Sequence, residues 1–233
     1  MQNPCHAIGA LAAASVLVAD NAAAETEFQL HTGYTSESRW RGLDLGNDLI
    51  EAGVDVTAAW NGLGLSAGAW YGYFNYAHQN VDELDLYGEV SKDFGWIQGS
   101  IGYIAYLYPQ TGSPTYQEIY CGISRDLDFA TASLKYFWDV QGDNNGYTEL
   151  GLSRSFTLNS CLSLSVDSNI GYMIEQDQAT AWTTKLTLDW SFYEHAKLSP
   201  FVAMSIALSD DADTPYFHSN NECVGGAMLG YTF

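Results

Sequence analysis

The chain has 233 residues, with 28 Asp and Glu against eight Lys and Arg, for a formal net charge of −20. This balance argues against a nucleic-acid partner, because phosphate binding needs clustered basic side chains. Apolar residues make up 47% of the chain, yet no long apolar run follows the N-terminal region, which excludes a transmembrane helix. The chain is long enough for one β-barrel domain, and this composition fits both a soluble domain and a transmembrane barrel.

The first 24 residues are expected to form a secretory signal peptide. Residues 8–18 are an apolar run, and Ala22-Ala23-Ala24 resembles an A-x-A cleavage site. The region before the run has no Lys or Arg, which is unusual for such a leader, and the alternative is a buried helix. This divides the chain into a signal peptide at 1–24 and an outer-membrane β-barrel at 25–233.

From residue 27 onward, strand-like segments alternate with turns. Short turns such as Asn61-Gly62 alternate with longer polar loops such as 36–47, which matches the periplasmic and extracellular ends of a barrel. The connection at 191–197 breaks this alternation, because it is long but falls on the short side. The twelve predicted strands of this antiparallel up-and-down barrel are 27–35, 48–60, 63–74, 81–93, 96–108, 115–125, 129–140, 146–156, 161–173, 180–190, 198–208 and 221–233.

The last strand is apolar at every second position and ends on an aromatic residue. Alternate residues share one face of a strand, so Ala227, Leu229, Tyr231 and Phe233 lie together. Outer-membrane barrels end in this way, and the barrel-assembly machinery that inserts them is therefore an expected partner. The apolar face is expected to contact lipid and the polar face to line the lumen.

The placement of the aromatic residues favours a membrane barrel over a soluble sandwich. A soluble core has no reason to sort aromatic side chains to strand ends, whereas a bilayer holds them at both headgroup levels. The expected location is the outer membrane of a Gram-negative-type bacterium, with membrane lipid as a partner and both termini periplasmic. The expected upper girdle is Tyr34, Tyr71, Trp138, Tyr172 and Trp182, and the lower girdle is Trp60, Phe156, Trp190, Tyr231 and Phe233.

Several segments resemble the TorF-type porin family of bacterial outer-membrane proteins. The resemblance covers most of the chain after residue 24, and it implies a barrel and a pore without supplying site residues. The matching segments are Ser38-Arg39-Trp40-Arg41-Gly42, Ser66-Ala67-Gly68-Ala69-Trp70, Glu83-Leu84-Asp85-Leu86-Tyr87-Gly88, Gly102-Tyr103-Ile104-Ala105-Tyr106-Leu107-Tyr108-Pro109 and Ala132-Ser133-Leu134-Lys135-Tyr136.

The inward positions of the predicted strands are strongly acidic. Lys135 and Lys185 are the only basic residues expected among them, and each should lie near a carboxylate on a neighbouring strand. A wall of one charge sign raises the local concentration of counter-ions, which favours cations in a pore. The expected pore-lining residues are Glu51, Asp55, Glu83, Asp85, Glu89, Glu118, Lys135, Asp139, Glu149, Asp167, Lys185 and Asp189.

Three functions fit these residues. The first is a passive diffusion pore for small cationic or neutral solutes. Arg39 and Arg41 in the first loop would narrow this pore if the loop folded inward, and the alternative is that they are solvated loop charges. The second is a closed structural or adhesion barrel with a plugged acidic lumen. The third and least favoured is a lipid-modifying enzyme, since no Ser is obviously paired with a His. No cofactor or metal site is predicted.

Overall fold

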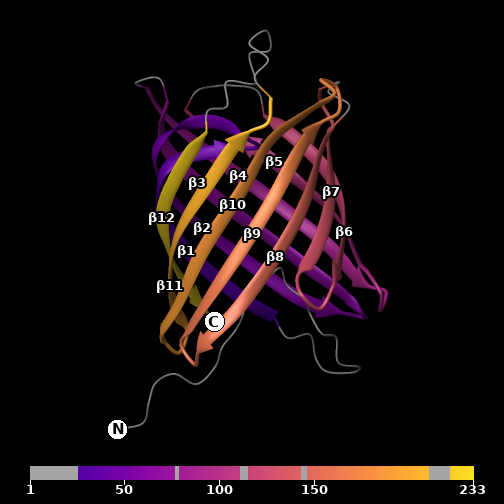
Figure 1. Ribbon diagram of the computed structural model, residues 1–233, viewed down its shortest axis with the longest axis vertical. Helices are drawn as coiled ribbons and strands as arrows, with labels where there is room; N and C mark the ends of the chain where they lie inside the picture. Colours follow the sequence, from indigo (N-terminus) through magenta and orange to yellow (C-terminus); the bar gives the residue numbers. More distant parts are fainter. Residues whose placement is uncertain (1–25, 77–78, 111–114, 143–145, 210–220) are drawn as a thin grey trace.

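The computed structural model describes residues 26–76, 79–110, 115–142, 146–209 and 221–233. These residues form an all-β, antiparallel up-and-down barrel that closes where β1 pairs with β12, as the alternation predicts (Figure 1). No helix in the described part of the chain is long and apolar enough to cross a membrane. The strands are β1 (Thr26–Trp40), β2 (Leu43–Trp60), β3 (Leu63–Tyr76), β4 (Gln79–Asp93), β5 (Gln98–Leu107), β6 (Tyr116–Asp126), β7 (Thr131–Asp139), β8 (Tyr147–Asn159), β9 (Leu162–Met173), β10 (Gln178–Tyr193), β11 (Ala196–Ala207) and β12 (Glu222–Thr232).

The connections at the lower end of Figure 1 are all short, and the C-terminus lies at the same end. Asn61 and Gly62 join β2 to β3 with φ angles of 49° and 77°, the geometry of a two-residue hairpin turn of type I′. The predicted long connection at 191–197 is wrong. β10 continues to Tyr193 and β11 begins at Ala196, because the two strands keep pairing through a register irregularity at the turn.

The apolar residues cover the outside of the barrel. Leu186 pairs with Val166 and Val202 on its two neighbours and remains 41% exposed. No large side chain among the described residues is less than 2% exposed, so the barrel has no conventional apolar core. An apolar outer wall of this extent would be an aggregation hazard in water and suits a hydrocarbon environment.

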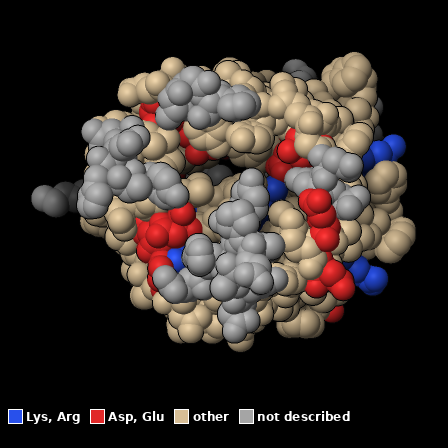
Figure 2. Space-filling model, turned by 90° about the horizontal axis from the view of Figure 1, so that it is seen from above, with Lys and Arg blue, Asp and Glu red and all other residues tan. Residues whose placement is uncertain are grey.

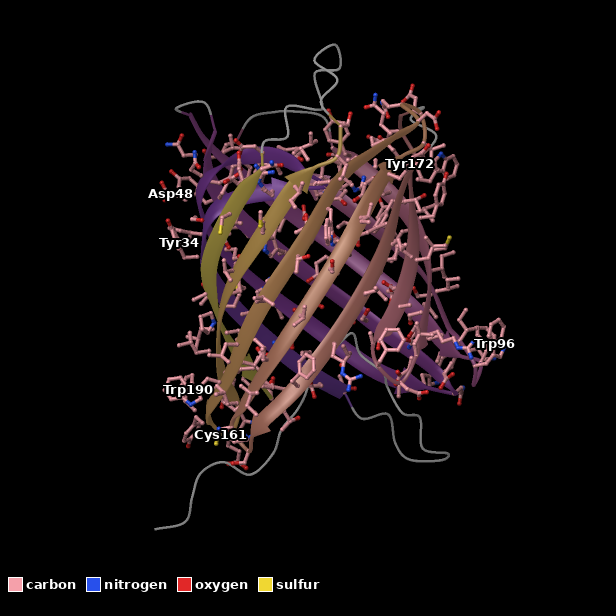
Figure 3. All side chains as sticks on the ribbon, in the orientation of Figure 1. Tyr34, Asp48, Trp96, Cys161, Tyr172 and Trp190 are labelled. Atoms are coloured by element: carbon pink, nitrogen blue, oxygen red, sulfur yellow. The ribbon has the colours of Figure 1, made fainter. Side chains whose placement is uncertain are left out.

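Aromatic side chains stand at both ends of this outer wall. In Figure 3, Tyr34 and Tyr172 lie toward the upper end, and Trp96 and Trp190 lie toward the lower end. All ten residues of the predicted girdles are among the exposed large side chains. Trp96 also belongs to the lower set and is 66% exposed, although it lies in a turn that strand periodicity does not cover.

The hairpin that joins β1 to β2 is longer than the sequence predicts. The segment 36–47, expected to be a loop, is mostly strand, with a turn at Arg41 and Gly42. β1 pairs with β12 only as far as Thr35, and beyond this point β1 pairs with β2 alone. The prediction was wrong because this segment mixes charged, aromatic and polar residues and lacks the strict alternation of a barrel wall strand.

Candidate functional site: the barrel lumen

The tip of the β1–β2 hairpin, residues 36–46, leaves the barrel wall and enters the lumen; we call it the inner hairpin. Its strands have register shifts at Ser38–Arg39 in β1 and between Asn47 and Ile50 in β2. Such bulges bend a strand and increase its local twist, which re-aims the segment beyond them. In the strand pairing, residues 36–46 therefore pair only within the β1–β2 hairpin, and the inner hairpin is held to the wall by side-chain contacts.

The strongest of these contacts joins Arg41 to Glu118 on β6, across the lumen. The guanidinium donates two hydrogen bonds of 2.7 and 2.6 Å to the two carboxylate oxygens. The side chains of Arg41 and Glu118 are only 8% and 5% exposed, so this bidentate ion pair is largely screened from water. Arg41, one of the two candidate constriction residues, thus points inward.

The turn at the tip places Arg41 in an unusual backbone conformation. Its φ is 54°, in the left-handed region, where Asn, Asp or Gly is the usual choice for this position of a type I′ turn. Gly42 follows with φ of 88°, and a Cβ atom there would come within 2.8 Å of the Ala181 Cβ on β10. The tip therefore packs closely against β10, and Arg41 adopts a backbone conformation that is costly for a side chain of its kind.

Arg39 anchors the base of the inner hairpin. Its guanidinium donates to Glu37 on the same strand at 2.7 Å and pairs with Glu222 on β12. Glu37 and Glu222 also approach Asp44, so the three carboxylates could in principle hold a metal ion. Because Arg39 already supplies the positive charge that these carboxylates need, we assign no metal to this cluster.

Among the residues that the structure describes, three cavities lie around and below the inner hairpin. The upper cavity has a volume of about 470 Å³ and is lined by the hairpin together with the wall. The first lower cavity, of about 280 Å³, shares Glu149 and Asn169 with the upper one. The second lower cavity, of about 330 Å³, shares Asp167 with the first lower cavity and Met228 with the upper one. Neighbouring cavities thus meet at common wall residues.

Each cavity wall holds more acidic than basic residues. The first lower cavity is lined by Glu89, Glu149 and Asp167 against Lys135. Seen from the upper end, the barrel is hollowed near its centre, with Asp and Glu side chains gathered around the hollow (Figure 2). Ten of the twelve predicted pore-lining residues line a cavity: Glu51, Asp55, Glu83, Asp85, Glu89, Lys135, Glu149, Asp167, Lys185 and Asp189.

The other two predicted pore-lining residues have local roles. Glu118 is 4% exposed and holds Arg41. Asp139, at the end of β7, accepts hydrogen bonds from the backbone N–H groups of Gln141 and Gly142 at 2.8 and 3.0 Å. An aspartate that accepts such bonds stabilises the turn that follows it.

The prediction that each of the two lumen lysines lies near a carboxylate on a neighbouring strand is partly correct. In the strand register, Lys185 lies opposite Asp167 and Lys135 lies opposite Glu149. Among the described residues, however, neither lysine has a carboxylate oxygen within 4.0 Å. The Lys185 ammonium lies instead 4.1 Å from the ring centroid of Phe201, a cation–π contact.

The lumen holds more basic groups than the sequence predicted. Lys197 forms an ion pair with Asp189 at 3.1 Å, and Ser199 donates to the same carboxylate at 2.5 Å. The sequence analysis missed Lys197 because it was assigned to the long connection at 191–197. Because Lys197 also faces the lumen, the expectation that Lys135 and Lys185 are the only basic residues at inward strand positions is wrong.

Several lumen carboxylates are held by aromatic donors. Tyr87 donates to Asp55 at 2.5 Å, and the His31 ring lies 3.2 Å from the same carboxylate. Trp70 donates from its indole nitrogen to Glu51 at 2.7 Å. Just beyond β5, Tyr108 donates to Glu83 at 3.2 Å, and burial, together with the charge of Glu83, raises the pKa of the Tyr108 phenol.

The barrel is similar to solved outer-membrane porins and channels. A NanC porin has a TM-score of 0.54 and 12% identity, covering 88% of this chain and 98% of that chain. KdgM porin has a TM-score of 0.53 and 10% identity, with 89% and 99% covered. An outer-membrane channel from Pseudomonas putida F1 has a TM-score of 0.54 and 11% identity, with 89% and 95% covered. At these identities the likeness establishes the fold alone.

The sequence itself matches one family over most of its length. Residues 19–228 match the family described as "Bacterial protein of unknown function (Gcw_chp)". No curated protein matches the sequence. The function must therefore be inferred from the lumen and the outer wall of this barrel.

Proposed function

This chain belongs to the Gcw_chp family of bacterial proteins of unknown function, and we propose that it is a passive channel for small cationic or neutral solutes. The observation that carries this proposal is the set of adjoining lumen cavities, each with an excess of acidic residues in its wall. Fixed negative charge in a narrow, partly desolvated passage concentrates cations and repels anions. The proposal therefore includes a cation preference.

The outer wall supports a location in the outer membrane. Its apolar side chains and the two aromatic sets at its ends suit a bilayer, and porins and channels share its fold. We infer that the end with short turns and the C-terminus faces the periplasm. A signal peptide at 1–24, recognition of β12 by the barrel-assembly machinery, and the kinship with TorF-type porins belong to the same proposal.

The inner hairpin would then act as the constriction. Arg41 and Gly42 contact β6 and β10 from inside the lumen, so the hairpin narrows the upper cavity along one side. Its two arginines add local positive charge to an otherwise acidic passage. We propose that they limit the size and charge of the cations that pass.

The same hairpin favours one alternative function. If it blocks the lumen completely, the protein is a closed structural or adhesion barrel. A lipid-modifying enzyme has less support: His31 pairs with Asp55 inside the lumen, His195 packs on Tyr231, and neither is hydrogen-bonded to a serine in the described part of the chain. His6, His78 and His218 lie outside the described residues.

Single-channel recording in planar bilayers separates these functions. We expect discrete conductance steps from the purified protein and larger steps from Arg41→Asn, because Asn fits the turn but cannot hold Glu118. Arg125→Asn is the matched control, since Arg125 is exposed on the outer face of β6. Failure of both the native protein and Arg41→Asn to conduct would reject the channel in favour of the closed barrel.

A further inference from the structure

Arg41 occupies a site that has the features of a cation-binding pocket. Its guanidinium carbon lies 4.2, 4.7 and 4.3 Å from the ring centroids of Trp40, Phe137 and Tyr147. The edge of the same guanidinium meets the Glu118 carboxylate in two hydrogen bonds. Aromatic faces around a cation and a carboxylate at its edge are the elements of guanidinium recognition.

Most of this pocket belongs to the barrel wall rather than to the inner hairpin. Glu118, Phe137 and Tyr147 come from β6, β7 and β8, and only Trp40 travels with Arg41. Tyr106 on β5 donates to Glu118 at 3.0 Å and so orients the carboxylate. The wall part of the pocket therefore does not need Arg41 to hold its shape.

The aromatic side chains of the wall are fixed by their own contacts. Tyr106 and Tyr147 are 8% and 3% exposed. The Phe137 ring packs between Tyr120 and Tyr147, with centroid distances of 5.3 and 6.0 Å. Such packing keeps the wall pocket preorganised, which lowers the entropic cost of binding a cation there.

The carboxylate in this pocket depends on a single cation. Among the described residues, Arg41 is the only basic side chain within 4.0 Å of Glu118. If the tip of the hairpin moved away, a carboxylate that is 5% exposed would be left without a counter-charge, which is costly. A soluble cation could restore that charge from the upper cavity, whose wall includes Tyr106 and Tyr147.

We propose that the pocket formed by Glu118, Tyr106, Phe137 and Tyr147 binds alkylguanidinium solutes and that Arg41 is a built-in competitor for it. A planar guanidinium matches both the bidentate carboxylate and the ring faces, whereas an ammonium group matches neither as well. A solute that displaced Arg41 would release the tip of the inner hairpin. This proposal concerns binding, and it holds or fails whether or not the barrel conducts ions.

In the native protein, the tethered Arg41 guanidinium competes with free alkylguanidinium solutes because its effective concentration at the pocket is high. A group tethered close to its site acts at an effective concentration on the order of millimolar or more, so a free solute must exceed that level to compete. Removing Arg41 should expose the pocket. Arg41→Asn is the suitable change, because Asn tolerates the φ of 54° at this turn position.

The test is calorimetric titration of the refolded full-length protein in detergent with methylguanidinium and, separately, methylammonium. We expect Arg41→Asn to bind methylguanidinium at least about tenfold more tightly than the native protein does, and more tightly than it binds methylammonium. Adding Glu118→Gln to Arg41→Asn should abolish this binding. Heat-modifiable gel mobility checks that every variant folds.

Two results would overturn the proposal. One is equal affinity of the native protein and Arg41→Asn for methylguanidinium, and the other is binding that survives Glu118→Gln. If Arg41→Asn does not fold, Arg41→Lys replaces it, because Lys keeps the charge but loses the planar fork. Arg41→Lys should still bind methylguanidinium more tightly than the native protein, and equal binding would reject the site.

Discussion

Replacing Glu118 by Gln should lower the free energy of unfolding of the barrel by about 2–3 kcal/mol. The change removes the negative partner of Arg41, whose side chain is only 8% exposed and whose guanidinium donates two short hydrogen bonds to Glu118. Removal of one partner from a buried ion pair costs about 3–5 kcal/mol. We expect a value at or below the lower end because the tip can move and let water reach Arg41.

A double-mutant cycle separates this ion pair from other effects of the substitutions. Glu118→Gln, Arg41→Asn and the double variant should show a coupling energy of about 2 kcal/mol, because the second substitution removes the charge that the first one leaves unpaired. The assay is urea unfolding of the protein in lipid vesicles, followed by tryptophan fluorescence and extrapolated linearly to water.

Glu89→Gln is the matched control for the cycle. Glu89 is a lumen carboxylate on β4 that forms no ion pair within 4.0 Å among the described residues. Its replacement should cost less than about 1 kcal/mol, in the range of a single neutral hydrogen bond. If the stability losses of Glu118→Gln and Arg41→Asn simply add in the double variant, with a coupling energy below about 0.5 kcal/mol, Arg41 and Glu118 do not hold the inner hairpin.

Two further predictions test the faces of the barrel and the fit of the hairpin tip. Leu186→Arg should destabilise the barrel in vesicles by about 2–4 kcal/mol, whereas Thr187→Arg, on the lumen face, should cost much less; equal costs would reject the face assignment. Gly42→Ala should destabilise the barrel more than Gly62→Ala does in the same assay. Both glycines have positive φ, but a Cβ atom at Gly42 would lie 2.8 Å from the Ala181 Cβ, whereas a Cβ atom at Gly62 would have no neighbour within 4 Å. Similar losses at the two glycines would mean that backbone strain alone matters and that the tip is not packed against β10.

The barrel wall could be predicted from the sequence because its determinants are local. Successive side chains of a strand point to opposite faces, so the apolar and polar alternation assigns each wall residue to lipid or lumen. Tight turns such as Asn61-Gly62 set the register of the hairpins. The pairing of Lys185 opposite Asp167 follows from the same rule. Such patterns need no knowledge of distant residues.

The inner hairpin could not be predicted in this way. Its position depends on Arg41 meeting Glu118, which is 77 residues away in the chain and lies on β6, four strands from β2 around the barrel. The one local signal was Arg41 in the Arg-Gly turn, where Asn is the usual choice at the first position. Lys197 was missed for a different reason, because the start of β11 was predicted at residue 198, whereas the strand begins at Ala196.

The most direct test of the proposed cation preference is the reversal potential of the open channel in a potassium chloride gradient at pH 7. The native protein should give the sign expected for potassium permeation, and the preference should weaken at 1 M salt, where the Debye length is about 3 Å. The triple variant Glu89→Gln, Glu149→Gln, Asp167→Asn should reduce the preference, because these carboxylates outnumber Lys135 in the first lower cavity. A reversal potential of the opposite sign, showing chloride preference in the native protein, would contradict the account.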